Sequence, residues 1–203
     1  MSRWMMLTCV AGLLLVSAPA SAQYIGIFLD PNASSCAADV GPAPRVDLHL
    51  IAVLGGDVPE LTGTEFRIVG APESWTPQNV LWVPDVESVF SVGNPIFPNH
   101  PYDEGGVAVI FSTCQTGGTS HRVTLGRIVL LGPPTADNVH LKVVTTGIYG
   151  SRVPCPAVTR CDAPAYSYAC VGGGEVVLNG PAPASCQVAV EERTWTSIKS
   201  LYL

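Results

Sequence analysis

The segment from residue 45 to residue 69 constrains the fold most, because it contains two runs in which apolar and polar residues alternate. The runs read RVDLHLIAVL and TGTEFRIV, and the connection between them has turn-forming residues at its centre. Alternation with a period of two is typical of a β-strand that buries one face. We therefore expect two strands here, and we expect later segments to supply strands that close a core over this pair.

Further apolar runs recur along the chain with turn signals between them. They predict strands over residues 23–30, 106–114, 121–131 and 138–146. One or two short strands are also predicted within a long, aromatic-rich excursion over residues 71–106. Strands at this spacing, with almost no helical periodicity between them, predict an all-β fold, an antiparallel β-sandwich.

Glycines add detail to this prediction. Gly126 lies inside the 121–131 run, where a glycine predicts a bulge or a close approach of the backbone. Residues 166–171 and 175–178 flank three consecutive glycines and are predicted to form a hairpin. The 106–114 run, GVAVIFSTC, is predicted to be a buried strand because it is rich in Val, Ile and Phe.

Both ends of the chain depart from the strand pattern. Residues 1–22 combine a positive start, an apolar stretch and small residues at the end, which is typical of a secretory signal peptide. Near the other end, apolar residues recur at helical spacing and predict a short helical tail that docks on the domain or acts as a sorting signal: Trp195, Ile198, Leu201 and Tyr202. The expected organisation is a signal peptide (1–22), a β-sandwich domain (23–190) and the tail (191–203).

The cysteines indicate an oxidising compartment. Cys9 lies in the expected signal peptide, and six cysteines remain: Cys36, Cys114, Cys155, Cys161, Cys170 and Cys186. An even number in an exported chain predicts three disulfides, with the pairing left open. The spacings match no common zinc pattern, so no metal site is expected at these residues. We expect a secreted protein, extracellular or periplasmic, with attachment to the cell surface as one alternative.

The composition excludes several classes of partner. The net charge is -6 and no cluster of Lys and Arg occurs, which argues against nucleic acid and against an anionic membrane surface. No segment after the signal peptide is long and apolar enough for a membrane helix. With 47% hydrophobic and 13% charged residues, the chain is expected to fold rather than to stay disordered.

Catalytic motifs are absent from the sequence. It contains no G-x-S-x-G elbow, no H-E-x-x-H pair and no phosphate-binding glycine loop, and its four histidines are scattered. We therefore expect no enzyme and no cofactor. The alternative is a secreted hydrolase whose acid–base groups converge in the 71–106 excursion.

Two groups of residues are candidates for binding. Trp75, Trp82 and Tyr102 could stack on sugar rings or anchor a peptide if they are exposed, or they could plug the ends of the sandwich. Oxygen-bearing turn residues are weak candidates for calcium, although none has the spacing of an EF-hand loop: Asp30, Asn32, Asp103 and Glu104.

The order of segments resembles cohesin-like domains of the carbohydrate-binding β-sandwich group. The resemblance rests on VDLHLIAV, LTGTEFRIV, GVAVIFS and LGRIV, and it covers residues 46–146. It implies a nine-stranded, jelly-roll-like sandwich that serves adhesion or assembly rather than catalysis. Cohesins generally lack this cysteine framework, and no partner-binding residue carries across by motif. The chain also resembles secreted bacterial proteins of unassigned activity that share the start IGIFLDP and the ending W-x-x-I-K-x-L-Y.

These observations favour a non-catalytic binding or structural module. The expected partner is a glycan, or an extracellular or envelope protein.

Overall fold

The computed structural model describes residues 23–41, 43–56, 58–98, 105–132, 136–146, 154–161, 167–183 and 186. The expected signal peptide, the helical tail with Trp195, Ile198, Leu201 and Tyr202, and the candidates Tyr102, Asp103 and Glu104 lie outside these residues. Within the described ranges, no helix has the length and hydropathy that a membrane span requires.

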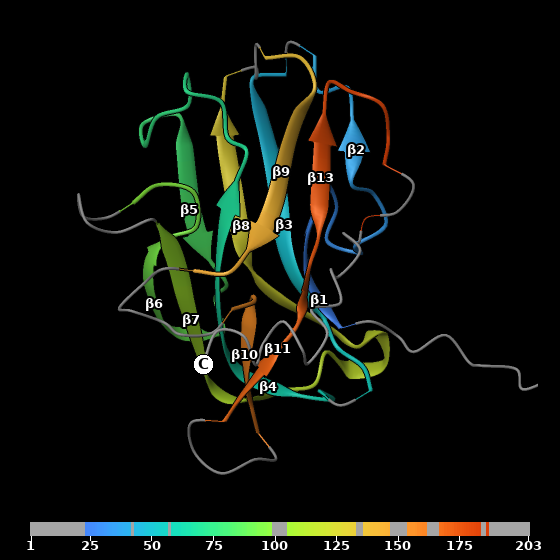
Figure 1. Cartoon of the computed structure of the whole chain (residues 1–203), viewed down its shortest axis with the longest axis vertical. Coiled ribbons are helices and arrows are strands. Elements are labelled where there is room, and N and C mark those ends of the chain that lie inside the picture. The colour runs from blue at the N-terminus through green and yellow to red at the C-terminus, as the bar shows by residue number, and fades with distance from the viewer. Residues whose placement is uncertain are drawn as a thin grey trace, which may run out of the picture.

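The chain forms two β-sheets that pack around a common core, which confirms the all-β sandwich (Figure 1). The first sheet has the strand order β12-β1-β3-β8-β5: Gly172–Gly173, Tyr24–Phe28, Arg45–Val53, Arg122–Leu131 and Val80–Pro84. A short 3-10 helix, η1 (Gly118–Ser120), precedes β8.

The second sheet has eight strands. Its main path is β11-β10-β4-β9-β13-β2: Tyr168–Cys170, Ala157–Arg160, Leu61–Val69, Val139–Val144, Glu175–Leu178 and Ala37–Ala38. Strand β7 (Gly106–Gln115) pairs with the other side of β4, and β6 (Ser88–Asn94) pairs with β7.

The two alternating runs are the strands β3 and β4, and their apolar residues are buried in the core as predicted. They do not pair with each other. Strand β3 lies between β1 and β8, whereas β4 pairs with β7 on one side and with β10 and β9 on the other. The connection between them therefore carries the chain from one sheet to the other. A sandwich buries the apolar faces of two sheets against each other, so consecutive one-sided strands can meet face to face instead of edge to edge.

The predicted hairpin around Gly172–Gly174 is wrong. Strand β11 pairs with β10 in the second sheet, β12 runs parallel to β1 in the first, and β13 returns to the second beside β9. The glycines let the chain cross where two backbones come close, because a Cβ on Gly173 would collide with the carbonyl group of Val143. Three consecutive glycines are compatible with a tight turn and with a crossing between sheets, so the sequence pattern alone does not distinguish the two.

The 71–106 excursion contains two strands, as predicted, and each extends a different sheet. Strand β5 forms the edge of the first sheet, and β6 pairs along β7 in the second. Opposite β5, the bulge predicted at Gly126 is confirmed. The β3–β8 register shifts between Leu50 and Ile51, and a Cβ on Gly126 would lie 2.6 Å from the carbonyl oxygen of Val83.

The six cysteines that follow the expected signal peptide pair with one another, which confirms the three predicted disulfides. Cys36–Cys186 spans 150 positions and ties the segment before β2 to the chain after β13. Cys114–Cys161 joins the end of β7 to the end of β10, and Cys155–Cys170 joins β11 to the residues before β10. Two of the three bonds therefore brace the β7-β4-β10-β11 half of the second sheet.

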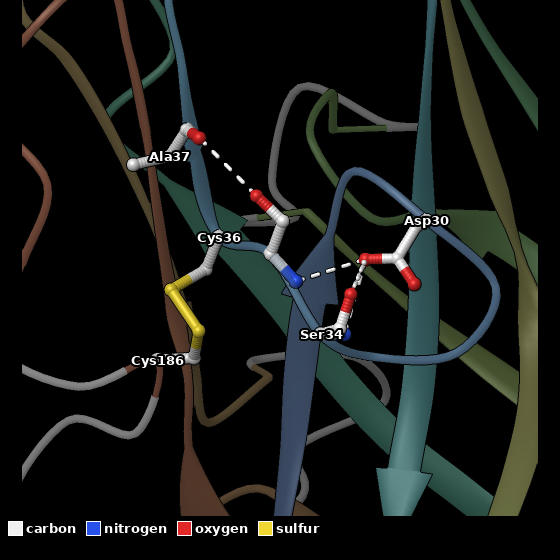
Figure 2. Close-up of a disulfide and its surroundings, with 6 residues drawn as sticks. Asp30, Ser34, Cys36, Ala37 and Cys186 are labelled. Carbon is white, nitrogen blue, oxygen red and sulfur yellow. Dashed lines mark hydrogen bonds between the residues drawn. A yellow bond between two sulfur atoms is a disulfide. The ribbon is translucent and has the colours of Figure 1, made fainter.

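The loop beside Cys36 is organised by one carboxylate (Figure 2). Asp30 accepts hydrogen bonds from the backbone N–H groups of Asn32, Ser34 and Ser35 and from the Ser34 hydroxyl, at 2.8–3.0 Å. Partial desolvation acts to raise the pKa of Asp30, but these hydrogen bonds outweigh it and hold the pKa below its ordinary value.

Candidate functional site

The predicted aromatic candidates lie mostly inside the sandwich. Trp75 is only 8% exposed and belongs to the core. Trp82 is half-buried over Gly126, and its indole N–H donates a hydrogen bond to the Ser91 hydroxyl at 3.1 Å. These positions favour the alternative in which the large aromatic residues fill the sandwich and do not face a ligand.

A different set of apolar residues is exposed, and most of them gather on the second sheet. Phe90 on β6 is 52% exposed, Ile110 on β7 is 44% exposed, and Tyr168 on β11 is 48% exposed. The expectation that the 106–114 run is buried is therefore wrong for one of its faces. Val107, Val109 and Phe111 point into the core, and the alternation turns Ile110 outward.

The exposed side chains lie in one line across five strands. Phe90 is paired with Ile110, Ile110 with Gly63, Gly63 with Thr159, and Thr159 with Tyr168. Residues paired across a sheet point to the same side, so this line, here called the apolar row, faces away from the core. At its centre Gly63 has no side chain. A Cβ there would lie 3.2 Å from the carbonyl oxygen of Val109, 3.4 Å from the Thr159 hydroxyl and 3.8 Å from the Ile110 side chain, so the neighbours already fill the space above Gly63 and the row is flat at its centre.

A second row runs beside the first on the same face. It pairs Val92 with Ala108, Ala108 with Glu65, Glu65 with Ala157, and Ala157 with Cys170. Its residues are small or apolar except for the carboxylate of Glu65 at the centre. Ala157 is only 1% exposed, whereas Val92, Ala108 and Glu65 are half-buried. The register shifts in these pairings lie directly beside the apolar row, next to Phe90, Gly63 and Thr159, and the second row lies away from them.

Elsewhere on the outer surface of the sheets, charged side chains form ion pairs, although Leu81 and Leu131 on the first sheet are also exposed. On the first sheet, Asp47 accepts two hydrogen bonds from Arg45, at 2.6 and 2.8 Å, and lies 3.5 Å from Arg127. The hydrogen bond from Arg45 lowers the pKa of Asp47. Partial desolvation opposes this effect, and the charges of Arg45, Arg127 and His49 add to it. On the β9–β13 part of the second sheet, Glu175 contacts His140 at 2.5 Å and Lys142 at 3.7 Å. The two rows are thus a local apolar surface beside charged ones.

The His140–Glu175 contact is the one histidine–carboxylate contact in the described part of the chain. The Nδ1 atom of His140 meets Glu175, and its Nε2 atom lies 3.0 Å from the side-chain oxygen of Asn138. Both ring nitrogens are therefore engaged, one by a carboxylate and the other by an amide oxygen. The contact also lies on β9 and β13, outside the 71–106 excursion to which the hydrolase alternative assigned the chemistry.

The candidate metal ligands are also engaged with the chain. Both carboxylate oxygens of Asp30 accept hydrogen bonds from its own loop, and the Asn32 carbonyl accepts one from Arg122. Calcium binding at Asp30 and Asn32 stays a prediction. In the described ranges one further group, Glu60 with Cys114 and Cys161, has donor atoms close together, but its two sulfurs are bonded to each other.

Part of the signal for the apolar surface is present in the sequence. The alternation of β4 leaves Gly63 and Glu65 on the face opposite Phe66, and the apolar run of β7 is longer than one buried face requires. Which strands lie beside β4 and β7, and in which register, depends on contacts between distant segments. The row therefore could not be assembled from the sequence.

Comparisons with known proteins identify no family for this chain. No protein-family model matches the chain, and no curated protein matches it. Among solved structures, the chain is similar to the seventh ScaB type I cohesin from Pseudobacteroides cellulosolvens. The TM-score is 0.40 with 12% sequence identity, over 81% of this chain and 96% of that chain. A similarity of this size carries no argument about activity or partner, so the assignment of this chain rests on its own geometry.

Proposed function

We propose that this protein is a non-catalytic binding module that docks a protein partner on the outer face of β6, β7, β4, β10 and β11. The observation that carries the proposal is the apolar row, in which Phe90, Ile110 and Tyr168 are exposed in register on strands that are far apart in sequence. Contiguous exposed apolar surface on a folded domain marks a site of interaction.

The shape and chemistry of this face favour a protein over a glycan. Neighbouring strands lie about 4.8 Å apart, so a row across five strands is about 19 Å long. Next to it lie Val92 and Ala108, which have no side-chain group to bond sugar hydroxyls. Protein interfaces are enriched in aromatic and aliphatic side chains, and Phe90, Ile110 and Tyr168 fit this composition.

The disulfides favour a location outside the cytoplasm. Three disulfides in one domain are typical of proteins in an oxidising compartment, and two of them brace the strands that carry the apolar row. A braced sheet holds its exposed side chains in place before a partner arrives, and less ordering is then needed on binding. We therefore propose a secreted module, extracellular or periplasmic.

A pair of double variants tests the proposal. Phe90→Ser with Tyr168→Ser removes the two ends of the row. Leu81→Ser with Leu131→Ser is the matched control, because Leu81 and Leu131 are exposed to a similar degree on the first sheet. We expect a partner from the exported fraction of the source cells to bind the wild type and the control, and to lose at least tenfold in affinity for the row variant.

Three outcomes would contradict the proposal. In the first, both double variants bind the partner equally, so the row is not the docking face. In the second, a glycan array shows binding that depends on Phe90 and Tyr168, so the face recognises carbohydrate. In the third, no protein of the exported fraction distinguishes the wild type from the row variant. Circular dichroism and melting curves of all variants exclude a general loss of structure.

A further inference from the structure

The carboxylate of Glu65 lies at the centre of the docking face and has no partner. It is half-buried, and its cross-strand neighbours are Ala108 on β7 and Ala157 on β10. Within the described ranges Glu65 forms neither a hydrogen bond nor an ion pair. Arg67 lies two residues further along the same face, but it is not paired with Glu65. The other carboxylates on outward-facing strand positions differ, because Asp47 and Glu175 each contact a basic side chain.

A charge in this place has consequences once a partner covers it. In the unbound protein, water reaches part of the carboxylate and solvates it. A partner that buried the apolar row would also remove this water, and a buried carboxylate without a hydrogen-bond donor or a cation is strongly unfavourable. The face therefore rejects partners that are apolar throughout. It accepts partners that bring a positive charge to this one point.

We propose that the partner presents a lysine or arginine to Glu65, flanked by apolar side chains that pack along the apolar row. This inference rests on the proposed function, because it concerns the occupant of the same face. The net charge of -6 of the whole chain acts in the same direction, because it attracts a basic segment at long range.

The spacing of the two rows limits the arrangement of the partner segment. Gly63 and Glu65 are two residues apart on one strand, which separates them by about 7 Å. An apolar side chain that packs over the apolar row at Gly63 and a basic side chain at Glu65 must therefore be about 7 Å apart. Positions i and i+2 of a strand meet this condition, and positions i and i+4 of a helix come close to it.

The test uses charge variants of the full exported chain. A partner is first purified from the exported fraction by its retention on the wild type and its loss on Phe90→Ser. It is then titrated against Glu65→Gln, Glu65→Lys and the control Glu87→Gln, whose carboxylate is exposed on the turn between β5 and β6. We expect Kd to rise at least tenfold for Glu65→Gln and at least a hundredfold for Glu65→Lys, and to stay unchanged for Glu87→Gln. The salt dependence of Kd should be weaker for Glu65→Gln than for the wild type.

A charge swap completes the test. A carbodiimide cross-link or a mutational scan of the partner locates its basic residue, and changing that residue to Glu should restore binding to Glu65→Lys. A partner that needs Phe90 but binds the wild type and Glu65→Gln equally would overturn the charge inference and leave the proposed function standing. A partner indifferent to both Phe90 and Glu65 would overturn the proposed function itself. Failure of every charge swap would also contradict a direct contact between Glu65 and a cation.

Discussion

Gly126 lies in β8 beneath the ring of Trp82, with a φ of 153°. A side chain at this position would meet that ring and would lie 2.6 Å from the carbonyl oxygen of Val83 on the neighbouring strand. Because both the backbone angle and the space require glycine, we expect Gly126→Ala to lower the free energy of unfolding by more than about 2 kcal/mol. Urea unfolding measures this loss. Gly118→Ala is the control, since Gly118 has a φ of 57° but open space around it, and it should cost only about 1 kcal/mol.

The carboxylate of Asp30, in the loop before β2, should make the stability of the fold depend on pH. Its pKa is lowered in the folded protein by hydrogen bonds that exceed the effect of partial desolvation, so the ionised form stabilises the fold. This contribution is fully present above the pKa of an unfolded aspartate and is lost as the pH falls through the lower pKa of the folded state. We expect wild type to melt higher than Asp30→Asn at pH 7 and the difference to shrink below about pH 4. A difference in melting temperature that stays constant from pH 7 to pH 2.5 would contradict this explanation.

Among the elements, the three disulfides close loops of different lengths and therefore should differ in their effect on stability. A crosslink stabilises chiefly by restricting the unfolded chain, and the restriction grows with the loop that it closes. For separations of 150, 47 and 15 residues this predicts losses of about 5, 4 and 3 kcal/mol when Cys36–Cys186, Cys114–Cys161 and Cys155–Cys170 are replaced by alanine pairs. Denaturant unfolding of the three double variants gives the order. If the Cys155–Cys170 pair proved the costliest to remove, native contacts of β10 and β11 would outweigh loop entropy.

The elements also show what sequence patterns can and cannot predict here. In β9 the alternation of Val139, Leu141 and Val143 with polar residues predicted both the strand and its buried face, because burial on one side leaves a local mark. The neighbours of a strand leave no such mark. Strands β12 and β13 follow each other directly in the chain, but they lie in different sheets. Strand β12 runs parallel to β1, and β13 lies between β9 and β2. A hairpin was predicted there because the glycines that permit a sheet crossing also permit a turn.

For the whole molecule, the candidate site was missed for a related reason. Phe90, Ile110 and Tyr168 become one surface only through pairings between residues as far apart as Gly63 and Thr159, and neither exposure nor register of that kind is visible in a local window. Trp75 and Trp82 are candidates in the sequence because exposed aromatic rings can stack on sugars or anchor a peptide. In a sandwich such side chains fill the core. The exposed face is formed by the residues that alternate along each strand with the core-facing ones.

The short helical tail over residues 191–203 is predicted from the sequence alone. Whether it docks on the domain or acts as a sorting signal can be tested on the whole protein. A helix of nine residues is marginal by itself, so the apolar face of Trp195, Ile198 and Leu201 should need the domain to cover it. We expect deletion of residues 194–203 to lower the melting temperature by several degrees, on the order of 1 kcal/mol for a domain of this size, while the protein is still exported. Trp195→Ser should reproduce most of the effect, and Lys199→Ala, on the polar side of the helix, should not. A truncated protein that melts like the wild type but accumulates in a different compartment would instead identify the tail as a sorting signal.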